Sequence, residues 1–270
     1  MDNNVSEEVI SKTLQIVKEV GNYIKEELGK VQDGQIEEKD LNSLVSYVDK
    51  TAEEKLVPVL RGLIPDCSFI TEEETVEQQG TGTYTWIIDP LDGTNNFLHQ
   101  IPYFAVSVAL RKGKEIVFGV VYDIMRDDCF HAQKGKGAYT NDRKISVSKI
   151  KTLDKSILAT GFPYSNEVNT EPLIECIRYW TKNARGIRRL GAAALDLCYV
   201  ACGRLDFYYE RTINIWDIAA GVLIVAEAGG QVTDFYGEDE YFDKKMVIAS
   251  NGSFHDEIKQ VITDAYEKYQ

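Results

Sequence analysis

Residues 86–97 read WIIDPLDGTNNF, and the rest of the fold is organised around this stretch. The apolar run at residues 86–88 is typical of a buried strand, and it places Asp89 at the carboxyl end of that strand. Pro90 lacks a backbone N–H group, so we expect the strand to break there. Asp92 follows three residues after Asp89, across a turn. The spacing therefore predicts two carboxylates that converge on one site.

Gly93 and Thr94 come next and have the character of a helix N-terminus. Free backbone N–H groups at such a position bind anions, so cation ligands would lie beside a phosphate cradle. Asp, Pro and Gly are also the usual residues of turns, and this stretch alone is equally consistent with an ordinary turn.

The N-terminal side of this stretch predicts two helices and a loop. Apolar residues recur with helical spacing over residues 10–28, ending at Gly29, and again over residues 51–63, before Pro65. Residues 31–39 are polar and indicate a loop or a mobile hairpin. Short β-rich runs occur at residues 68–70, 85–88, 105–110, 116–122, 129–132 and 137–139. The first half is therefore predicted to place two helices on a largely antiparallel sheet.

The second half alternates between strand and helix patterns. Strands are expected at residues 157–160, 205–209 and 245–250. Helices are expected at residues 172–183, 192–202, 216–228 and 254–269, the last with Ser253 as its cap. Such alternation predicts α/β layering. We expect two closely packed halves, residues 1–145 and 146–270, with a seam near residues 141–151.

Composition indicates an ordinary globular protein of 270 residues, with 44% hydrophobic and 27% charged residues. No segment approaches the ~20 apolar residues that span a bilayer. The first ten residues have no basic region followed by an apolar core, so we expect no secretory signal and a cytoplasmic location. Five scattered cysteines without a CxxC pair indicate reduced, mostly buried thiols.

The net charge of −13 makes nucleic acid a poor partner, because its phosphate backbone would be repelled. Small phosphorylated substrates are anionic as well. Bound divalent cations would reverse the local charge and remove this difficulty.

Two further acidic elements extend the pattern. Glu72, Glu73 and Glu74 follow the strand at residues 68–70. A solvated charge run is the alternative there, and we accept it for Glu74 and for Glu77. Asp217 lies at the start of an apolar helix, where a capping role is the alternative. If the carboxylates converge, each pair about 4 Å apart costs on the order of 4 kcal/mol at an effective dielectric near 20. Only protonation or cations would sustain that arrangement, and oxygen ligands without His or Cys suit Mg²⁺.

Three segments together resemble the inositol monophosphatase family, within the lithium-sensitive, Mg²⁺-dependent phosphatases. They are SFITEEE, WIIDPLDGTNNF and WDIAAG, at residues 68–74, 86–97 and 216–221. The runs FGVVYD, AQKGKGAY and LGAAALDLCYVACGRLDFYYE are also similar to stretches of that family, and the resemblance extends from the first helix to about residue 253. It implies an α+β or α/β fold, a layered αβαβα sandwich of the inositol monophosphatase and fructose-1,6-bisphosphatase type, and a homodimer.

The resemblance implies two to three Mg²⁺ ions in each site. Glu72, Asp89 and the carbonyl of Leu91 would bind the first ion. Asp89, Asp92 and Asp217 would bind the second. Glu72 would share a weaker third, with Glu73 beside it.

The resemblance also implies catalytic and substrate-binding roles. Thr94 would position the attacking water, with Asp49 as its hydrogen-bond partner, and the Gly93 and Thr94 amides would hold the phosphate. Glu210 and the Ala193 amide would contact substrate hydroxyls, as Asp92 and Asp217 would too. From the residues alone, Asp49 is a helix cap and Glu210 a solvated strand end.

Two arginines and a few departures from the family pattern carry further expectations. Arg188 and Arg189 either approach the phosphate or form surface ion pairs, and the second is favoured. Where the family commonly has Asp before the residue matching Asp49, this chain has Ser43, with Lys39 only approximately aligned. Ala192 occupies a position that is often Thr or Ser in the family.

The function implied is Mg²⁺-dependent hydrolysis of small phosphate monoesters of the inositol 1-phosphate type. A metal-activated water would attack in line, without a phosphoenzyme, and Li⁺ would inhibit. NADP(H) 2′-phosphate and fructose 1,6-bisphosphate are alternative substrates of the same chemistry. A regulatory binding protein of the transcription machinery is the alternative from another class.

Overall fold

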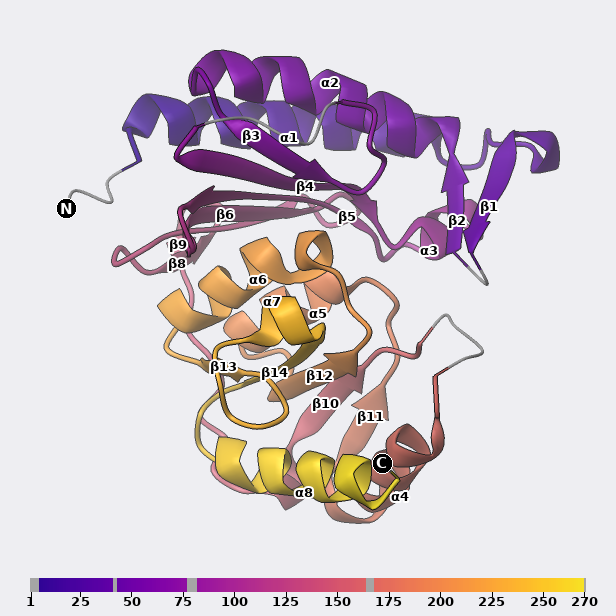
Figure 1. The fold of residues 1–270 in the computed structure, drawn as a ribbon, viewed down its shortest axis with the longest axis vertical. Helices are drawn as coiled ribbons and strands as arrows, with labels where there is room; N and C mark the ends of the chain where they lie inside the picture. The colour runs from indigo at the N-terminus through magenta and orange to yellow at the C-terminus, as the bar shows by residue number, and fades with distance from the viewer. Residues whose placement is uncertain (1–4, 41–42, 77–81, 164–167, 270) are drawn as a thin grey trace.

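The computed structural model describes residues 5–40, 43–76, 82–163 and 168–269. Five layers follow one another through the molecule: helices, a sheet, helices, a second sheet and helices (Figure 1). This confirms the predicted αβαβα sandwich. Glu77, which lies in the acidic loop, falls outside the described residues, as does the start of the chain.

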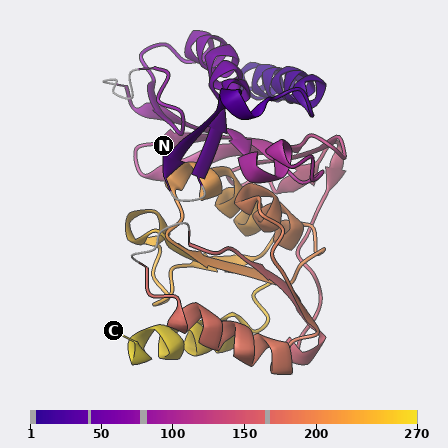
Figure 2. The ribbon, with the colours of Figure 1, turned by 90° about the vertical axis from the view of Figure 1, so that its right-hand side faces the viewer.

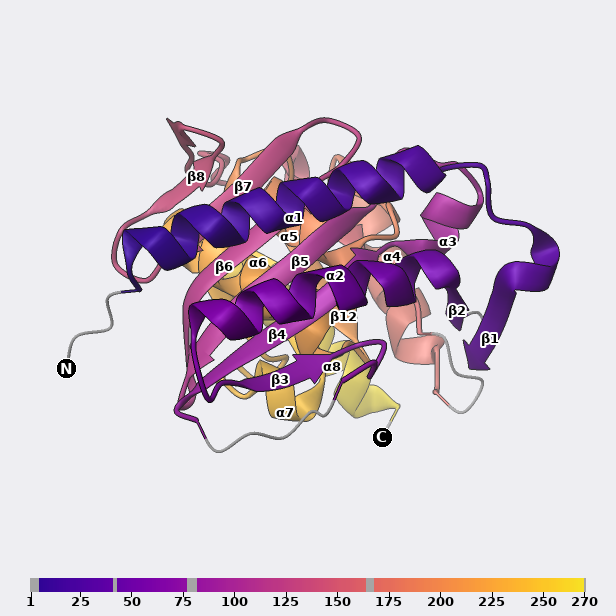
Figure 3. The same ribbon diagram turned by 90° about the horizontal axis from the view of Figure 1, so that it is seen from above.

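The outer helical layer consists of α1 (Glu7–Glu27) and α2 (Tyr47–Leu63), which lie side by side over the first sheet (Figure 3). Ser6 caps α1, and its side chain accepts from the Val9 amide at 3.3 Å. Both helices bury an apolar face against the sheet, as their spacing predicted.

The first sheet has seven strands, and every neighbouring pair is antiparallel except β3 and β4. Its strands in spatial order are β3 (Ser68–Thr71), β4 (Tyr84–Asp92), β5 (Ala105–Lys112), β6 (Glu115–Asp123), β7 (Asp128–Gln133), β8 (Ala138–Thr140) and β9 (Arg143–Lys144). The mostly antiparallel pairing predicted for the first half is confirmed. The parallel pairing of β3 with β4 brings their carboxyl ends to the same edge.

Strand β4 is buried on both faces because helices cover each side of the sheet. Trp86 and Ile88 pack with α1 and α2, whereas Ile87 packs with the middle helices. The indole N–H of Trp86 donates to the Leu60 carbonyl at 3.2 Å. This alternation fixes the register, and with it the direction in which the carboxylates after Ile88 point.

The middle layer is formed by α5 (Ala193–Ala201) and α6 (Ile215–Glu227), which contact both sheets. The second sheet has the order β11 (Gly186–Arg188), β10 (Ile157–Thr160), β12 (Phe207–Arg211), β14 (Met246–Ser250) and β13 (Gln231–Thr233). Helices α4 (Glu171–Asn183) and α8 (His255–Lys268) cover its far side. The predicted α/β alternation is confirmed, and β11 and β13 are additions that the sequence did not reveal.

Short elements complete the fold around the middle layer. A hairpin of β1 (Ile36–Asp40) and β2 (Ser43–Ser46) follows the turn η1 (Asp33–Gln35) and reaches down beside the middle helices (Figure 2). The hairpin alternative for residues 31–39 is therefore the observed one. The remaining short elements are α3 (Thr94–Leu98), η2 (Leu153–Lys155) and α7 (Tyr241–Lys244).

Two local expectations are wrong. Pro90 does not end the strand: β4 continues to Asp92, with an irregular register between Asp89 and Asp92 against β5. Proline is tolerated at such an irregularity because no ladder hydrogen bond needs its missing N–H. Ser253 does not cap α8, because its backbone N–H donates to the Asn251 side chain and the helix begins after Phe254.

The division into residues 1–145 and 146–270 stays a prediction, and the α5 and α6 layer packs against both sheets. In the part of the chain that the structure describes, no helix is long and apolar enough to cross a membrane.

His255 is a buried histidine that joins β13 and β14 to α8. Its Nδ1 lies 2.8 Å from the Ser250 hydroxyl, and its Nε2 lies 2.9 Å from the Thr233 hydroxyl. Burial lowers the pKa of His255 from its ordinary 6.5 to about 4. The neutral ring is therefore the form that the fold stabilises.

We predict that the free energy of unfolding falls between pH 6.5 and about pH 4, because the unfolded chain binds a proton on His255 that the folded chain excludes. This contribution is complete above pH 6.5 and amounts to at most about 3 kcal/mol. Urea unfolding of the wild type and of His255→Asn across this range measures it. The contributions of other titrating groups cancel when the free energies of unfolding of the two proteins are subtracted. Parallel pH profiles for the two proteins would show the prediction to be wrong.

Candidate active site

A pocket of about 150 Å³ lies between the two halves of the chain, where the ends of β4, α5 and α6 meet. Its lining comprises Leu44, Glu72, Asp89, Leu91, Asp92, Gly93, Thr94, Asn95, Gly161, Arg189, Gly191, Ala192, Ala193, Asp196, Glu210, Thr212, Ile213, Asn214 and Asp217. Six of these residues are acidic, and among the described lining residues only Arg189 is basic. The pocket is therefore strongly electronegative by its own residues.

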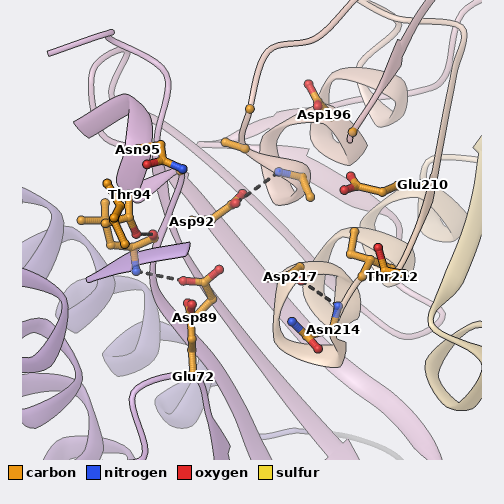
Figure 4. A pocket seen from close by; sticks show the side chains of 18 of the residues that line it. Glu72, Asp89, Asp92, Thr94, Asn95, Asp196, Glu210, Thr212, Asn214 and Asp217 are labelled. Carbon is orange, nitrogen blue, oxygen red and sulfur yellow. Dashed lines mark hydrogen bonds between the residues drawn. The ribbon is translucent and has the colours of Figure 1, made fainter. Parts of the chain in front are cut away.

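Four carboxylates converge from three elements, as predicted. Glu72 follows β3, Asp89 and Asp92 end β4, and Asp217 lies in the first turn of α6. The parallel pairing of β3 with β4 brings Glu72 beside Asp89, and the close view shows Asp92 next to Asp89 and Asp217 across the pocket from them (Figure 4). The carboxylates thus belong to one site rather than to separate turns.

Hydrogen bonds to backbone amides hold these side chains in place. Asp89 Oδ1 accepts from the Leu91 amide at 3.0 Å. Asp217 Oδ2 accepts from the Asn214 amide at 2.7 Å, within a capping box of α6. The capping role considered for Asp217 is therefore real, and the same carboxylate also lines the pocket.

Asp92 links the two halves directly. Its Oδ1 accepts from the Ala193 amide at 3.2 Å and its Oδ2 from the Ala194 amide at 2.7 Å, at the start of α5. The helix dipole favours a negative charge at this position. The Ala193 amide, which the resemblance assigns to a substrate hydroxyl, is engaged with Asp92 here.

Burial and mutual repulsion make full ionisation of this cluster unfavourable. Burial, followed by the charges of Glu72, Asp92 and Asp217, raises the pKa of Asp89 well above its ordinary range. Burial, followed by the charge of Asp92, does the same for Asp217. Burial raises the pKa of Asp92 to about 7, although the Ala194 amide opposes the shift. A cation bound among these carboxylates would offset their mutual repulsion.

The donor set fits Mg²⁺, because it consists of carboxylate and carbonyl oxygens. Glu72, Asp89, Asp92, Asp217 and the Leu91 carbonyl would hold it. In the described part of the chain, no three His, Cys, Asp or Glu side chains are arranged so that they could hold a metal ion as they stand.

The predicted pair of Thr94 and Asp49 is present. Thr94 Oγ1 lies 2.8 Å from Asp49 Oδ1 and 3.0 Å from the Leu91 carbonyl, and either oxygen can accept its single proton. Asp49 also caps α2, because its Oδ2 accepts from the Ser46 amide at 2.9 Å and the Ser46 hydroxyl at 2.7 Å. Thr94 is thereby left as an acceptor toward the pocket.

The predicted helix N-terminus at Gly93 and Thr94 is confirmed as the start of α3. Gly93 has a φ of +93°, which a residue with a side chain rarely adopts, and an added Cβ would lie 3.0 Å from the Tyr103 carbonyl. The backbone N–H groups of the first turn have no acceptor within the helix. They lie at the position where the phosphate cradle was predicted, and Gly93 and Thr94 both line the pocket.

Glu210, at the end of β12, lies on the far side of the pocket from Glu72 (Figure 4). It accepts a short hydrogen bond from the Tyr208 hydroxyl, and burial raises its pKa to about 7 against the opposing effects of Tyr208 and Arg189. The interpretation of Glu210 as a solvated strand end is therefore wrong.

The other predicted residues differ in whether they line the pocket. Arg188 and Arg189 are both exposed, and only Arg189 is among the described lining residues, with its guanidinium over the Phe162 ring. The expectation of surface ion pairs stays a prediction. Glu73 is not among the described lining residues, and its amide donates to Glu53 Oε2 at 2.9 Å. Ala192 lines the pocket, as its position implied.

Glu53 is a buried residue that the sequence reasoning missed. Its carboxylate accepts from the Thr71 hydroxyl and from the amides of Glu73 and Thr75, at 2.8–2.9 Å, and so fixes the loop that carries Glu72. Its spacing of four residues from Asp49 places it on the buried face of α2, and this signal was available. The surrounding run TAEEK suggested exposure instead.

Asp196 and Asn96 were also missed. Asp196 lines the pocket and accepts from the Tyr103 hydroxyl at 2.8 Å. As the single charged residue in a run of small and apolar residues on α5, it could have been singled out. Asn96 gave no such signal, because its partners are backbone carbonyls distant in sequence.

Comparison with known proteins agrees with this geometry. A sequence profile of the inositol monophosphatase family matches residues 5–270. The inositol-1-monophosphatase of Caulobacter vibrioides is 37% identical over 91% of this chain and 97% of its own length. The Nus factor SuhB of Pseudomonas aeruginosa is 39% identical over 90% of this chain and 91% of its own length.

Solved structures give the same result. The extragenic suppressor protein suhB of Bartonella henselae superposes with a TM-score of 0.90 at 39% identity, covering 95% of this chain and 98% of its own. The resemblance noted in the sequence and the predicted fold class are confirmed. The chain belongs to the inositol monophosphatase family, whose members are phosphatases that hydrolyse phosphomonoesters.

Proposed function

We propose that this chain is a Mg²⁺-dependent phosphatase that hydrolyses monophosphates of small polyols, of the inositol 1-phosphate type. The observation that carries the proposal is the convergence of Glu72, Asp89, Asp92 and Asp217 beside the amides that begin α3. Oxygen ligands for a hard cation and an anion cradle thus meet in one pocket. The name of the Caulobacter relative supports the substrate class.

When bound, Mg²⁺ would neutralise the phosphoryl oxygens and make the attacking water more acidic. The proton of the Thr94 hydroxyl is committed to Asp49 or to the Leu91 carbonyl. The Thr94 oxygen is then an acceptor that orients a water in the pocket. The Gly93 and Thr94 amides hold the phosphate, and the water attacks in line without a phosphoenzyme.

Groups from the second half would recognise the leaving group. Glu210 faces the pocket from β12, and a substrate hydroxyl would donate to its carboxylate. Arg189 adds a positive charge to this side. An NADP(H) 2′-phosphate or a sugar bisphosphate would use the same chemistry, and a panel of phosphate-release assays ranks them against inositol 1-phosphate.

A role in transcription is the second candidate, because the Pseudomonas relative carries the name Nus factor SuhB. Binding of the purified chain to RNA polymerase in stoichiometric amount, without phosphatase activity at any Mg²⁺ concentration, would favour it over the enzyme. A homodimer is also part of the proposal, and analytical ultracentrifugation tests it.

Asp217→Asn should lower kcat by more than about 100-fold. Changing a residue that only hydrogen-bonds to a metal ligand typically lowers activity by about 10- to 100-fold. The amide oxygen keeps the hydrogen bond from Asn214 that caps α6, so the melting temperature should change little. Steady-state phosphate release with inositol 1-phosphate measures the effect. Near wild-type turnover in this variant would remove Asp217 from the site.

Li⁺ should inhibit at tens of millimolar, because a small hard cation competes for the same oxygen ligands without supplying the second charge. Phosphate release at fixed Mg²⁺ with increasing LiCl measures this, with NaCl at equal ionic strength as the control. Equal rates in both salts would contradict the proposed metal site.

Gly161→Ala should raise the KM for inositol 1-phosphate, because an added Cβ would lie 1.9 Å from the Glu210 carboxylate. Glu210 must then leave its position at the pocket wall. The expected rise is about tenfold, the equivalent of roughly one lost hydrogen bond. An unchanged KM would show that Glu210 does not contact the substrate.

A further inference from the structure

Asn96 joins the two halves of the chain beside the pocket. Its Nδ2 donates to the Tyr103 carbonyl at 2.8 Å and to the Leu190 carbonyl at 2.8 Å. Tyr103 precedes β5 in the first half, and Leu190 lies in the loop before α5 in the second. Asn96 itself is 9% exposed and is not part of the described pocket lining.

The amide group of Asn96 matches these acceptors completely. A primary amide has two N–H donors, and both are used on backbone carbonyls that come from distant parts of the chain. A carboxylate in the same place would face two carbonyl oxygens without a proton to share. The position therefore requires an amide for chemical reasons and not only for its size.

Gly191 allows the backbone of the second half to approach the Asn96 side chain closely. Its φ is +94°, and an added Cβ would lie 3.0 Å from Asn96 Nδ2 and 2.6 Å from the Arg189 guanidinium. The absence of a side chain at Gly191 thus allows Asn96 and Arg189 to pack against the same short segment. Movement of this segment would move Arg189 as well.

The same segment is held a second time by Asp92, through the amides of Ala193 and Ala194. Residues 92–96 therefore bind residues 190–194 through two side chains, the charged Asp92 and the neutral Asn96. Asp92 is also a proposed metal ligand. Asn96 is not a proposed metal ligand and is not among the described lining residues.

We propose that Asn96 is a positioning residue that sets the leaving-group side of the pocket, Arg189 to Ala193, against the phosphate cradle at Gly93 and Thr94. It thereby favours substrates whose leaving group reaches the second half, such as a polyol. The inference rests on the proposed phosphatase function and adds a specificity determinant to it.

The test compares two substrates in Asn96→Asp and Asn96→Ser. Inositol 1-phosphate has hydroxyls that reach the second half, whereas p-nitrophenyl phosphate has a flat leaving group without them. We expect kcat/KM for inositol 1-phosphate to fall about tenfold more than kcat/KM for p-nitrophenyl phosphate, mainly through KM. Asn183→Asp is the matched control. The side-chain amide of this exposed Asn on α4 also donates a hydrogen bond to a backbone carbonyl, that of Tyr179, at 2.8 Å.

Gly191→Ala perturbs the same contact from the opposite side and should give the same change of substrate preference, which keeps the test valid if an Asn96 variant fails to fold. Equal losses on both substrates, or none on either, in the folded variants would overturn the inference while leaving the phosphatase function intact. A wild-type protein that hydrolyses neither substrate would overturn the proposed function, and the inference with it.

Discussion

The burial of several carboxylates in one pocket is the constraint on which the rest of the structure depends. Asp89 and Asp92 are buried, Asp217 is partly buried, and the three carboxylates repel one another, so their pKa values are raised. A fold keeps such an arrangement only if surrounding groups hold each side chain in place. Backbone amides at Leu91, Ala194 and Asn214 serve this purpose.

The layered architecture supplies these amides from both halves. The first sheet carries the metal-binding candidates at its carboxyl edge, and the middle helices bring their N-termini to the same edge. Helix N-termini favour the anionic side chains and the anionic substrate alike. Asp92 belongs to both functions, because it is a candidate ligand and also attaches α5 to the first half. Stability and chemistry therefore depend on the same contacts.

Much of this could be predicted from local sequence. Apolar periodicity indicated two helices on a largely antiparallel sheet followed by α/β alternation, and the spacing of Asp89 and Asp92 indicated two carboxylates at one site. The five layers and the place of Asp217 in the cluster were implied by the resemblance to the family. What could not be predicted depends on tertiary pairing. Strand β4 continues past Pro90 because β5 pairs with Asp92 again beyond the irregularity. The contacts of Asn96 join carbonyls 7 and 94 residues away, and no local pattern reveals them.

Thermal unfolding in rising concentrations of Mg²⁺ tests the central claim, that the carboxylate cluster is a divalent cation site. A cation that binds only the folded chain stabilises it by mass action, so the melting temperature should rise with Mg²⁺ well beyond its rise in NaCl of equal ionic strength. The excess should shrink in Asp89→Asn. Identical melting curves in MgCl₂ and in matched NaCl up to tens of millimolar would contradict the account.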